Sequence, residues 1–237
     1  MLTREDWAAT PGLRHGFLDA AACRGAPAWE AVVARVGAGL PVVTLRQVHG
    51  ARVVTAEAAD LARAGDASDA ARAPRPEADA VATATRGLLV GVVTADCVPA
   101  LLVDRRARVA AAVHAGWRGA AAGVLETAVA HLRARFGVEP SALEACLGPA
   151  IGPCCYRVGV EVREAFARTG SVTAPAWQAD GRGLRFDLRL AVRRLLEAAG
   201  IAAVETLGPC TACDPGFCSY RRDGEGAGRQ LSFIGWA

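Results

Sequence analysis

The sequence predicts a mixed α/β fold in one large domain that spans residues 1–237. Hydrophobic residues make up 52% of the chain, enough for a large buried core. Short apolar segments bounded by turn residues arrive in clusters, which is typical of strands. The helical patterns are few and well separated. Because regular β-α-β alternation is absent, we expect mixed sheets that are covered by helices.

Several segments have the length and the turn-residue borders of strands. They are Leu13–Leu18, Val42–Val48, Ala80–Thr83, Leu88–Thr94, Ala100–Val103, Val109–Val113, Leu143–Leu147 and Ala202–Leu207. No internal repeat interrupts them. Residues 56–79 are rich in Ala, Arg, Asp and Pro, and this composition indicates a surface excursion.

Helices are indicated by apolar residues at helical spacing. One is expected from Gly119 to Phe136, where Gly137 can close the C-terminus. Another begins after Asp187, a good N-cap, and ends at Gly200. Less regular patterns predict further helices over Trp29–Val36 and Gly159–Arg168.

Charge and hydropathy exclude some classes of partner. The net charge is only +3, and the basic residues, all arginine, are scattered without a basic face, so we expect no nucleic-acid partner. The longest apolar run, around Gly87 to Val93, is too short to cross a bilayer, and the first residues lack the order of a signal peptide. We therefore expect a soluble cytoplasmic protein without a membrane partner. The sequence does not indicate an oligomeric state.

Three apolar segments each end in a residue that binds soft metal ions. These residues are His49, Cys97 and His114. Strand ends are where α/β proteins collect their functional groups, so the three side chains can converge on one point. Two His and one Cys leave a fourth zinc position open for water or substrate, as in catalytic sites. The alternative is a buried thiol with two hydrogen-bonded histidines; for the three residues together, we favour the metal.

The neighbours of these residues suggest further roles. Asp96 precedes Cys97, where its carboxylate can orient a ligating imidazole, handle a proton, or simply cap the turn. After His114, the run from Gly116 to Gly119 leads directly into a helix, so Arg118 and free backbone N–H groups predict an anion site. Trp117 can stack on a base or pack in the core.

A second group of cysteines has the spacing of a redox pair or of half a structural zinc site. It consists of Cys210, Cys213 and Cys218, and the only partner available elsewhere is the pair Cys154 and Cys155. Adjacent residues rarely ligate one metal together. We therefore expect free thiols in a loop, and one zinc per chain.

Five motifs make the chain resemble the polyphenol oxidase, or laccase-domain, family of purine nucleoside phosphorylases. They are Arg46–Gly50, Thr94–Pro99, His114–Gly119, Gly148–Tyr156 and Phe217–Asp223, in order over nearly the whole chain. The chain departs from the family pattern at Arg157, where an acidic residue is usual, and at Cys213 and Cys218. These departures bear on substrate preference more than on the metal.

The resemblance implies a four-layer α-β-β-α fold, similar to that of a toxin class of cysteine hydrolases. It implies a catalytic zinc, with copper as the alternative metal, held by His49, Cys97 and His114. Catalytic roles for these residues and Asp96 are expected, together with substrate-binding roles for Arg46, Gln47, Trp117 and Arg118. The implied partners are phosphate and the purine nucleosides adenosine, inosine and methylthioadenosine. The implied activities are phosphorolysis, a glycosyl transfer, and hydrolytic deamination of adenosine; some bacterial members are linked to peptidoglycan editing.

Two other activities compete with the purine nucleoside phosphorylase. Copper-dependent phenol oxidation with oxygen calls for several coppers and many histidines, and the chain has only 4. A hydrolase of amides or cell-wall precursors would use Cys97 as the nucleophile and a histidine as the base. The activity of such a hydrolase would persist after metal chelation and would be abolished by thiol alkylation. A non-enzymatic role in the assembly of the cell wall would persist when Cys97 is replaced.

Overall fold

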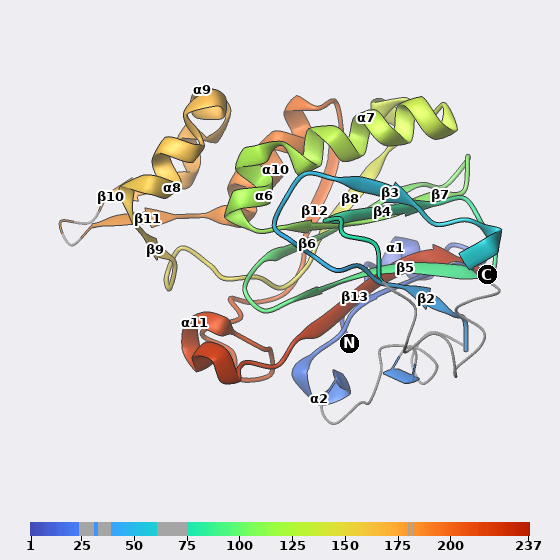
Figure 1. The fold of residues 1–237 in the computed structure, drawn as a ribbon, viewed down its shortest axis with the longest axis horizontal. Helices are drawn as coiled ribbons and strands as arrows, with labels where there is room; N and C mark the ends of the chain where they lie inside the picture. Colours follow the sequence, from blue (N-terminus) through green and yellow to red (C-terminus); the bar gives the residue numbers. More distant parts are fainter. Residues whose placement is uncertain (24–30, 33–38, 61–74, 180, 182) are drawn as a thin grey trace.

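The computed structural model describes residues 1–23, 31–32, 39–60, 75–179, 181 and 183–237. Figure 1 shows a layer of helices over a large sheet, a second sheet beneath it, and a small sheet with its own helices at one end. The sheets contain both parallel and antiparallel pairs, so the predicted mixed α/β class is confirmed. None of the helices in the described ranges has the length and apolar character that a membrane crossing requires.

The large sheet has six strands in the order β12-β8-β6-β7-β4-β3. Their bounds are β3 (Val53–Thr55), β4 (Ala80–Thr83), β6 (Val98–Asp104), β7 (Val109–Ala115), β8 (Glu144–Leu147) and β12 (Ala203–Thr206). The central strand β6 pairs antiparallel with β7 and β8, whereas the edge strands β3 and β12 run parallel to their neighbours.

The second sheet has four strands in the order β1-β13-β5-β2, and the small sheet has three in the order β10-β11-β9. The strands of the second sheet are β1 (Leu13–Phe17), β2 (Val42–Val43), β5 (Leu88–Thr94) and β13 (Gln230–Trp236). Those of the small sheet are β9 (Arg157–Val158), β10 (Trp177–Ala179) and β11 (Leu184–Phe186).

Alternation along the strands divides the core between two faces of the large sheet. In β6, Ala100 and Leu102 belong to the apolar cluster under the helices, while Leu101 and Val103 belong to the cluster between the two sheets. Successive side chains of a strand point to opposite faces, so a strand covered on both sides reads as one continuous apolar run. This explains why the central strands show no polar alternation in the sequence.

Helices α6, α7 and α10 lie over the outer face of the large sheet (Figure 1). The longer helices are α6 (Trp117–Ala122), α7 (Val124–Phe136), α8 (Val160–Ala165) and α10 (Leu188–Ala198). The shorter ones are α1 (Glu5–Ala8), α2 (Ala20–Cys23), α9 (Gly170–Thr173) and α11 (Tyr220–Asp223), with 3-10 turns at Pro140–Ala142, Ala167–Thr169, Ala174–Ala176 and Gly224–Gly226. The expected cap of α10 is confirmed, because Asp187 accepts a hydrogen bond from the Leu190 backbone N–H at 3.0 Å.

The bounds predicted from the sequence agree best with the structure where the local pattern of apolar and turn residues is strong. Strands β4 and β5 have the bounds expected from the sequence. The predicted strand Val42–Val48 is wrong beyond Val43, because the chain leaves the sheet there to carry His49. The predicted helix Gly119–Phe136 is divided by Gly123, whose φ of 90° ends α6 and begins α7. Strand β13 was missed.

The fourth layer of the expected α-β-β-α fold is only partly within the described ranges. A small apolar cluster on the outer face of the second sheet includes Leu18, Val32 and Phe233, and Ala22 of α2 packs against it. The helix predicted over residues 29–36 lies outside the described residues except for Ala31 and Val32, which are helical. Much of the excursion predicted over residues 56–79 also lies outside them.

Candidate metal centre and substrate cavity

The structure brings His49, Cys97 and His114 together from three different elements. His49 follows the segment after β2, Cys97 lies in the turn between β5 and β6, and His114 lies near the end of β7. Their ligand atoms all lie within 4.8 Å of one another, and Cys97 Sγ is 3.9 Å from His49 Nε2. We call these three residues the His49 cluster.

Two residues of this region have left-handed backbone that non-glycine residues rarely adopt. The φ of His49 is 60° and that of Asp96 is 82°. The buried Asp79 carboxylate holds the turn at His49, and the buried Thr211 hydroxyl bonds the side chain of Asp96. Such strain persists only where its surroundings enforce it, and it is common at functional sites.

Asp79, which precedes β4, accepts hydrogen bonds from three successive backbone N–H groups, those of residues 48–50, and contacts the imidazole ring of His114. Its side chain is fully buried, and its carboxylate accepts hydrogen bonds from the backbone N–H groups of His49 at 2.9 Å and Gly50 at 2.7 Å. The same carboxylate lies 2.8 Å from His114 Nδ1. In the neutral ring this contact keeps the proton on Nδ1 and presents Nε2 to a metal, whose binding displaces the second proton of the charged ring.

Asp79 therefore makes the imidazole contact that the sequence suggested for Asp96. The Asp96 carboxylate instead accepts hydrogen bonds from Thr211 Oγ1 at 2.7 Å and from the Arg221 backbone N–H at 2.6 Å. These bonds explain how its unusual backbone is held. Sequence reasoning missed Asp79, since its only signal is an acidic residue directly before a short, mostly apolar strand.

The electrostatics of the His49 cluster favour a thiolate beside a charged imidazole. Burial opposes ionisation of Cys97, but hydrogen bonds and charge from His114 and His49 outweigh it and lower the pKa of the thiol to about 6. Burial also opposes protonation of His114, yet its bonds to Asp79 and Cys97 raise its pKa to about 9. The Cys97 sulfur is therefore a ready ligand or nucleophile at neutral pH.

A cavity of about 550 Å³ opens above the His49 cluster. Its walls carry three aromatic rings and three arginines besides the cluster itself. The lining residues are Gln47, His49, Val93, Thr94, Ala95, Asp96, Cys97, His114, Trp117, Arg118, Ile151, Tyr156, Tyr220, Arg221 and Arg229. The volume is within the usual range of small-molecule sites.

The four predicted substrate-binding residues have different positions. Trp117 and Arg118 line the cavity, with the Arg118 guanidinium 4.3 Å from the Trp117 ring centroid. Gln47 also lines it, but both ends of its amide bond the Val93 backbone, at 2.7 and 2.8 Å. Arg46 does not line it, because its exposed side chain pairs with Glu77 instead.

Besides Ile151, four polar or aromatic lining residues from the later part of the chain were not predicted. Tyr156 and Arg221 form a stacked pair, with the guanidinium 5.2 Å from the ring centroid, and the Arg221 side chain donates to the carbonyls of Cys155 and Arg157. Tyr220 and Arg229 complete that wall. Tyr156, Tyr220 and Arg221 lie in motifs that carried the family resemblance, whereas Arg229 does not, and nothing in their spacing linked these residues to His49.

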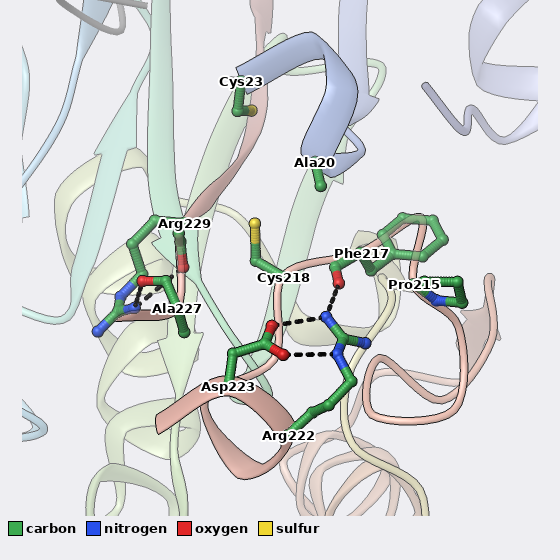
Figure 2. Close-up of a pocket in the computed structure, with 10 residues that line it drawn as sticks. Ala20, Cys23, Pro215, Phe217, Cys218, Arg222, Asp223, Ala227 and Arg229 are labelled. Carbon is green, nitrogen blue, oxygen red and sulfur yellow. Dashed lines mark hydrogen bonds and ion pairs between the residues drawn. The ribbon is translucent and has the colours of Figure 1, made fainter. Parts of the chain in front are cut away.

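Of the seven remaining cysteines, Cys146 is buried in the core between the two sheets, and the other six fall into two separate places. Cys154, Cys155, Cys210 and Cys213 form a second group whose sulfur atoms all lie within 4.8 Å of one another. Cys218 is not part of it. Figure 2 shows Cys218 in another cavity, of about 710 Å³, with Cys23, while the neighbouring Arg222 pairs with Asp223. The sequence spacing placed Cys218 beside Cys210 and Cys213 and showed no fourth ligand, whereas in the structure Cys154 and Cys155 join Cys210 and Cys213, and Cys218 lies apart.

The donor set of the His49 cluster fits one metal ion. Two imidazoles and one thiolate suit zinc and leave a position open, and copper accepts the same donors. The other two histidines are engaged elsewhere: His15 Nε2 accepts from the Arg4 backbone N–H, and His131 Nε2 is 2.8 Å from Thr55 Oγ1. Too few imidazoles remain for a centre of several coppers.

Comparisons with known proteins agree with this picture. A family model described as multi-copper polyphenol oxidoreductase laccase matches residues 26–237. A protein of Xylella fastidiosa named purine nucleoside phosphorylase is 41% identical over 191 residues, which cover 78% of this chain and 69% of the relative.

Two solved structures share the fold. The crystal structure of YlmD from Geobacillus stearothermophilus is similar with 35% identity and a TM-score of 0.75, covering 83% of this chain and 73% of that one. The crystal structure of the hypothetical protein YfiH from Bacillus licheniformis has 26% identity and a TM-score of 0.84, and it covers 98% and 95% of the two chains.

Proposed function

The chain belongs to the family described as multi-copper polyphenol oxidoreductase laccase, whose curated relatives include purine nucleoside phosphorylases, and on that premise we propose that it is a zinc-dependent purine nucleoside phosphorylase. Its substrates in this proposal are phosphate and the nucleosides adenosine, inosine and methylthioadenosine. Deamination of adenosine is the second proposed activity of the same cavity. We further propose that residues 1–237 act as a single domain.

The observation that carries this proposal is the combination of a three-ligand cluster and basic and aromatic walls in one cavity. A purine offers a flat face for stacking, and phosphate offers a dianion for arginine. In phosphorolysis, a phosphate oxygen forms a bond to the anomeric carbon while the bond from that carbon to the purine nitrogen breaks. The departing purine takes up a proton.

Arg118 is our choice for the residue that binds phosphate. Among the described residues, no carboxylate pairs with its guanidinium, which lies over the ring of Trp117. Its charge is therefore available to a ligand. Trp117 is proposed to stack on the purine, and Arg221, fixed by two backbone carbonyls, to face the substrate from the opposite wall.

The metal is proposed to be held by His49, Cys97 and His114. When bound there, zinc would supply a Lewis acid and lower the pKa of a coordinated water. Asp79 would hold the proton on His114 Nδ1, so that the ring keeps its orientation. Asp96, which lines the cavity, is proposed to handle the proton exchanged with the purine.

A second candidate function rests on the position of Cys97, whose Sγ lies 3.9 Å from His49 Nε2 in the wall of the cavity. A thiolate next to His114 has the features of a cysteine hydrolase, in which sulfur attacks an amide carbon and the histidine protonates the leaving amine. The two candidates differ in their inhibition. Chelation abolishes turnover by the zinc enzyme, whereas the hydrolase keeps its turnover until the thiol is alkylated.

The decisive assay measures ribose 1-phosphate and adenine formed from adenosine and phosphate. Arg118→Ala is expected to raise the KM for phosphate at least about tenfold, because losing a charge-assisted hydrogen bond costs about 1.5–3 kcal/mol. Adenosine deamination needs no phosphate and should change less. Arg106→Ala, on the exposed turn after β6, is the matched control and should leave both activities unchanged.

Metal content provides an independent test. His49→Ala and Cys97→Ala are each expected to lose one equivalent of zinc relative to the parent, with circular dichroism unchanged, because an open site seldom holds a domain together. If Cys97→Ala keeps its full zinc, the ligand assignment is wrong. If Arg118→Ala impairs phosphorolysis and deamination equally, Arg118 does not bind phosphate.

A further inference from the structure

The second group of sulfur atoms has the dimensions of a metal site. Cys213 Sγ lies 3.6 Å from Cys154 Sγ and 3.3 Å from Cys155 Sγ, and all four sulfurs, including that of Cys210, fall within 4.8 Å of one another. A tetrahedron with zinc–sulfur bonds of about 2.3 Å has edges of about 3.8 Å. The thiols are therefore already spaced for a single ion. All are free.

Two chain segments that are distant in sequence are fixed together at this point. An isolated parallel bridge joins Ala150 to Cys210, and the Gly152 backbone N–H donates to Cys210 Sγ at 3.1 Å across 58 residues. Each segment also turns back on itself. In the first, the N–H groups of Cys155 and Tyr156 both donate to the Gly152 carbonyl, and in the second, the Cys213 N–H donates to the Cys210 carbonyl. Because of the turn at Gly152, the sulfur atoms of the adjacent residues Cys154 and Cys155 both reach Cys213. Adjacent residues rarely bind one metal ion together, but here the backbone allows it.

The surroundings suit the charge that such a site would carry. Four thiolates around Zn²⁺ have a net charge of −2, which needs nearby positive groups. The side chain of Arg185 donates to the carbonyls of Pro153 and Cys154, and Arg221 donates to that of Cys155. On the other segment, Arg189 donates to the Gly208 carbonyl at 2.9 Å. These guanidinium groups hold the cysteine-bearing backbone and supply the positive charge.

We propose that Cys154, Cys155, Cys210 and Cys213, the four-cysteine cluster, form a second and closed site that binds one zinc ion with all-thiolate, tetrahedral coordination. Binding would release the thiol protons as the four sulfurs coordinate. Four protein ligands leave no position for water, so the site is structural. It raises the expected content from one zinc per chain to two.

The four-cysteine cluster is connected to the substrate cavity through the residues that follow two of its cysteines. Tyr156, which follows Cys155, lines that cavity, and Thr211, which follows Cys210, donates to the Asp96 carboxylate. An ion that ties the two segments together would therefore fix this wall and support the turn that carries Cys97. Its loss should disturb the cavity without removing any ligand of the His49 cluster.

The test counts zinc per chain by elemental analysis and native mass spectrometry, on full-length protein purified under reducing conditions. The parent should carry two equivalents, the double variant Cys210→Ser and Cys213→Ser one, and His49→Ala one. Cys218→Ser is the matched control, because it changes a thiol of the same segment that lies outside the four-cysteine cluster, and it should keep two. One zinc in the parent and none in His49→Ala would refute the four-cysteine site alone. Equal zinc in the parent and in His49→Ala would refute the His49 site alone.

A second measurement does not depend on the double variant folding. His49→Ala, stripped of zinc and titrated with Co²⁺, should bind one equivalent with the visible absorption of tetrahedral all-sulfur coordination, and bound metal should protect four cysteines from alkylation. One zinc in the parent with all four thiols reactive would overturn the proposal. So would a disulfide between Cys155 and Cys213, seen as a mass lower by two hydrogens and restored by reductant.

Discussion

At the scale of single residues, Gly116 has the tightest surroundings in the metal centre. A Cβ atom at this position would lie 3.0 Å from Cys97 Sγ and 3.0 Å from His49 Cδ2. Both distances are closer than ordinary contacts and both atoms belong to proposed ligands. The turn after β7 can therefore lie this close to Cys97 and His49 only because Gly116 has no side chain.

Gly116→Ala is predicted to weaken zinc binding at the His49 cluster by about 10–100-fold, the usual effect of disturbing the surroundings of a metal ligand. The measurement is competition with a chelator in the Cys210→Ser and Cys213→Ser background, where only this site remains. Gly226→Ala, whose added Cβ would meet no atom within 4 Å, is the control and should bind as the parent does. Parental affinity in Gly116→Ala would contradict the observed approach.

His15 makes stability depend on pH. The ring is only 5% exposed, and burial, aided by the charge of Arg4, lowers its pKa from 6.5 to about 4. The unfolded chain therefore binds more protons than the folded one between these values. The contribution, up to about 3 kcal/mol, is fully present above pH 6.5 and is lost as the pH falls towards 4.

The variant His15→Gln keeps an acceptor for the Arg4 backbone N–H but does not titrate. We predict that it loses most of this acid sensitivity between pH 6.5 and about 4. The measurement is the free energy of unfolding from urea titrations at several pH values within this window. An equally steep decline in parent and variant would assign the acid sensitivity to other groups.

At the scale of elements, the segment after β7 shows how one glycine divides a helix. The apolar residues Leu125, Ala128 and Leu132 all lie in α7 and are buried, as their spacing predicts. The helix does not extend back to Gly119 as one piece, because Gly123 has a φ of 90° and a ψ of 30°. The break turns α6 so that Trp117 and Arg118 reach the cavity while α7 covers the sheet.

Gly123→Ala is predicted to lower the free energy of unfolding by about 1–2 kcal/mol, the cost of left-handed backbone for a residue with a side chain. Urea denaturation followed by circular dichroism measures it. Gly170→Ala is the matched control, because Gly170 has ordinary helical backbone and open space around it, and alanine there should be neutral or stabilising by up to about 1 kcal/mol. Equal effects in both variants would contradict this explanation.

At the scale of the whole molecule, β6 separates two apolar cores. Leu102 packs under the helices and Leu101 packs between the two sheets, and both side chains are fully buried. Neighbouring residues of one strand thus stabilise different layers. The same strand follows the turn that contains Cys97, so the two cores together determine where that ligand lies.

Leu101→Ala and Leu102→Ala are each predicted to cost about 2–5 kcal/mol of the free energy of unfolding, from lost burial and the cavity left behind. Urea titrations of the two variants provide the measurement, with Arg106→Ala as an exposed control. A two-layer molecule would have one of the two side chains exposed. A cost below about 1 kcal/mol for Leu101→Ala would therefore contradict the packing of one sheet on the other.

The sequence by itself determined the features that depend on near neighbours. Strands β4 and β5, the Asp187 cap of α10 and the apolar face of α7 were all predicted, because apolar spacing, capping and turn residues act over about four positions. The three residues of the His49 cluster were selected because each stands at the end of an apolar segment.

The tertiary structure alone decided which distant residues meet. Asp79 reaches His114, Tyr156 joins the cavity wall, and Cys154 and Cys155 meet Cys213, each across a long stretch of chain. These contacts follow from the order of strands in the sheets and from the turn at Gly152. Local periodicity carries no information about strand order, because any order that buries the same apolar faces satisfies the same pattern.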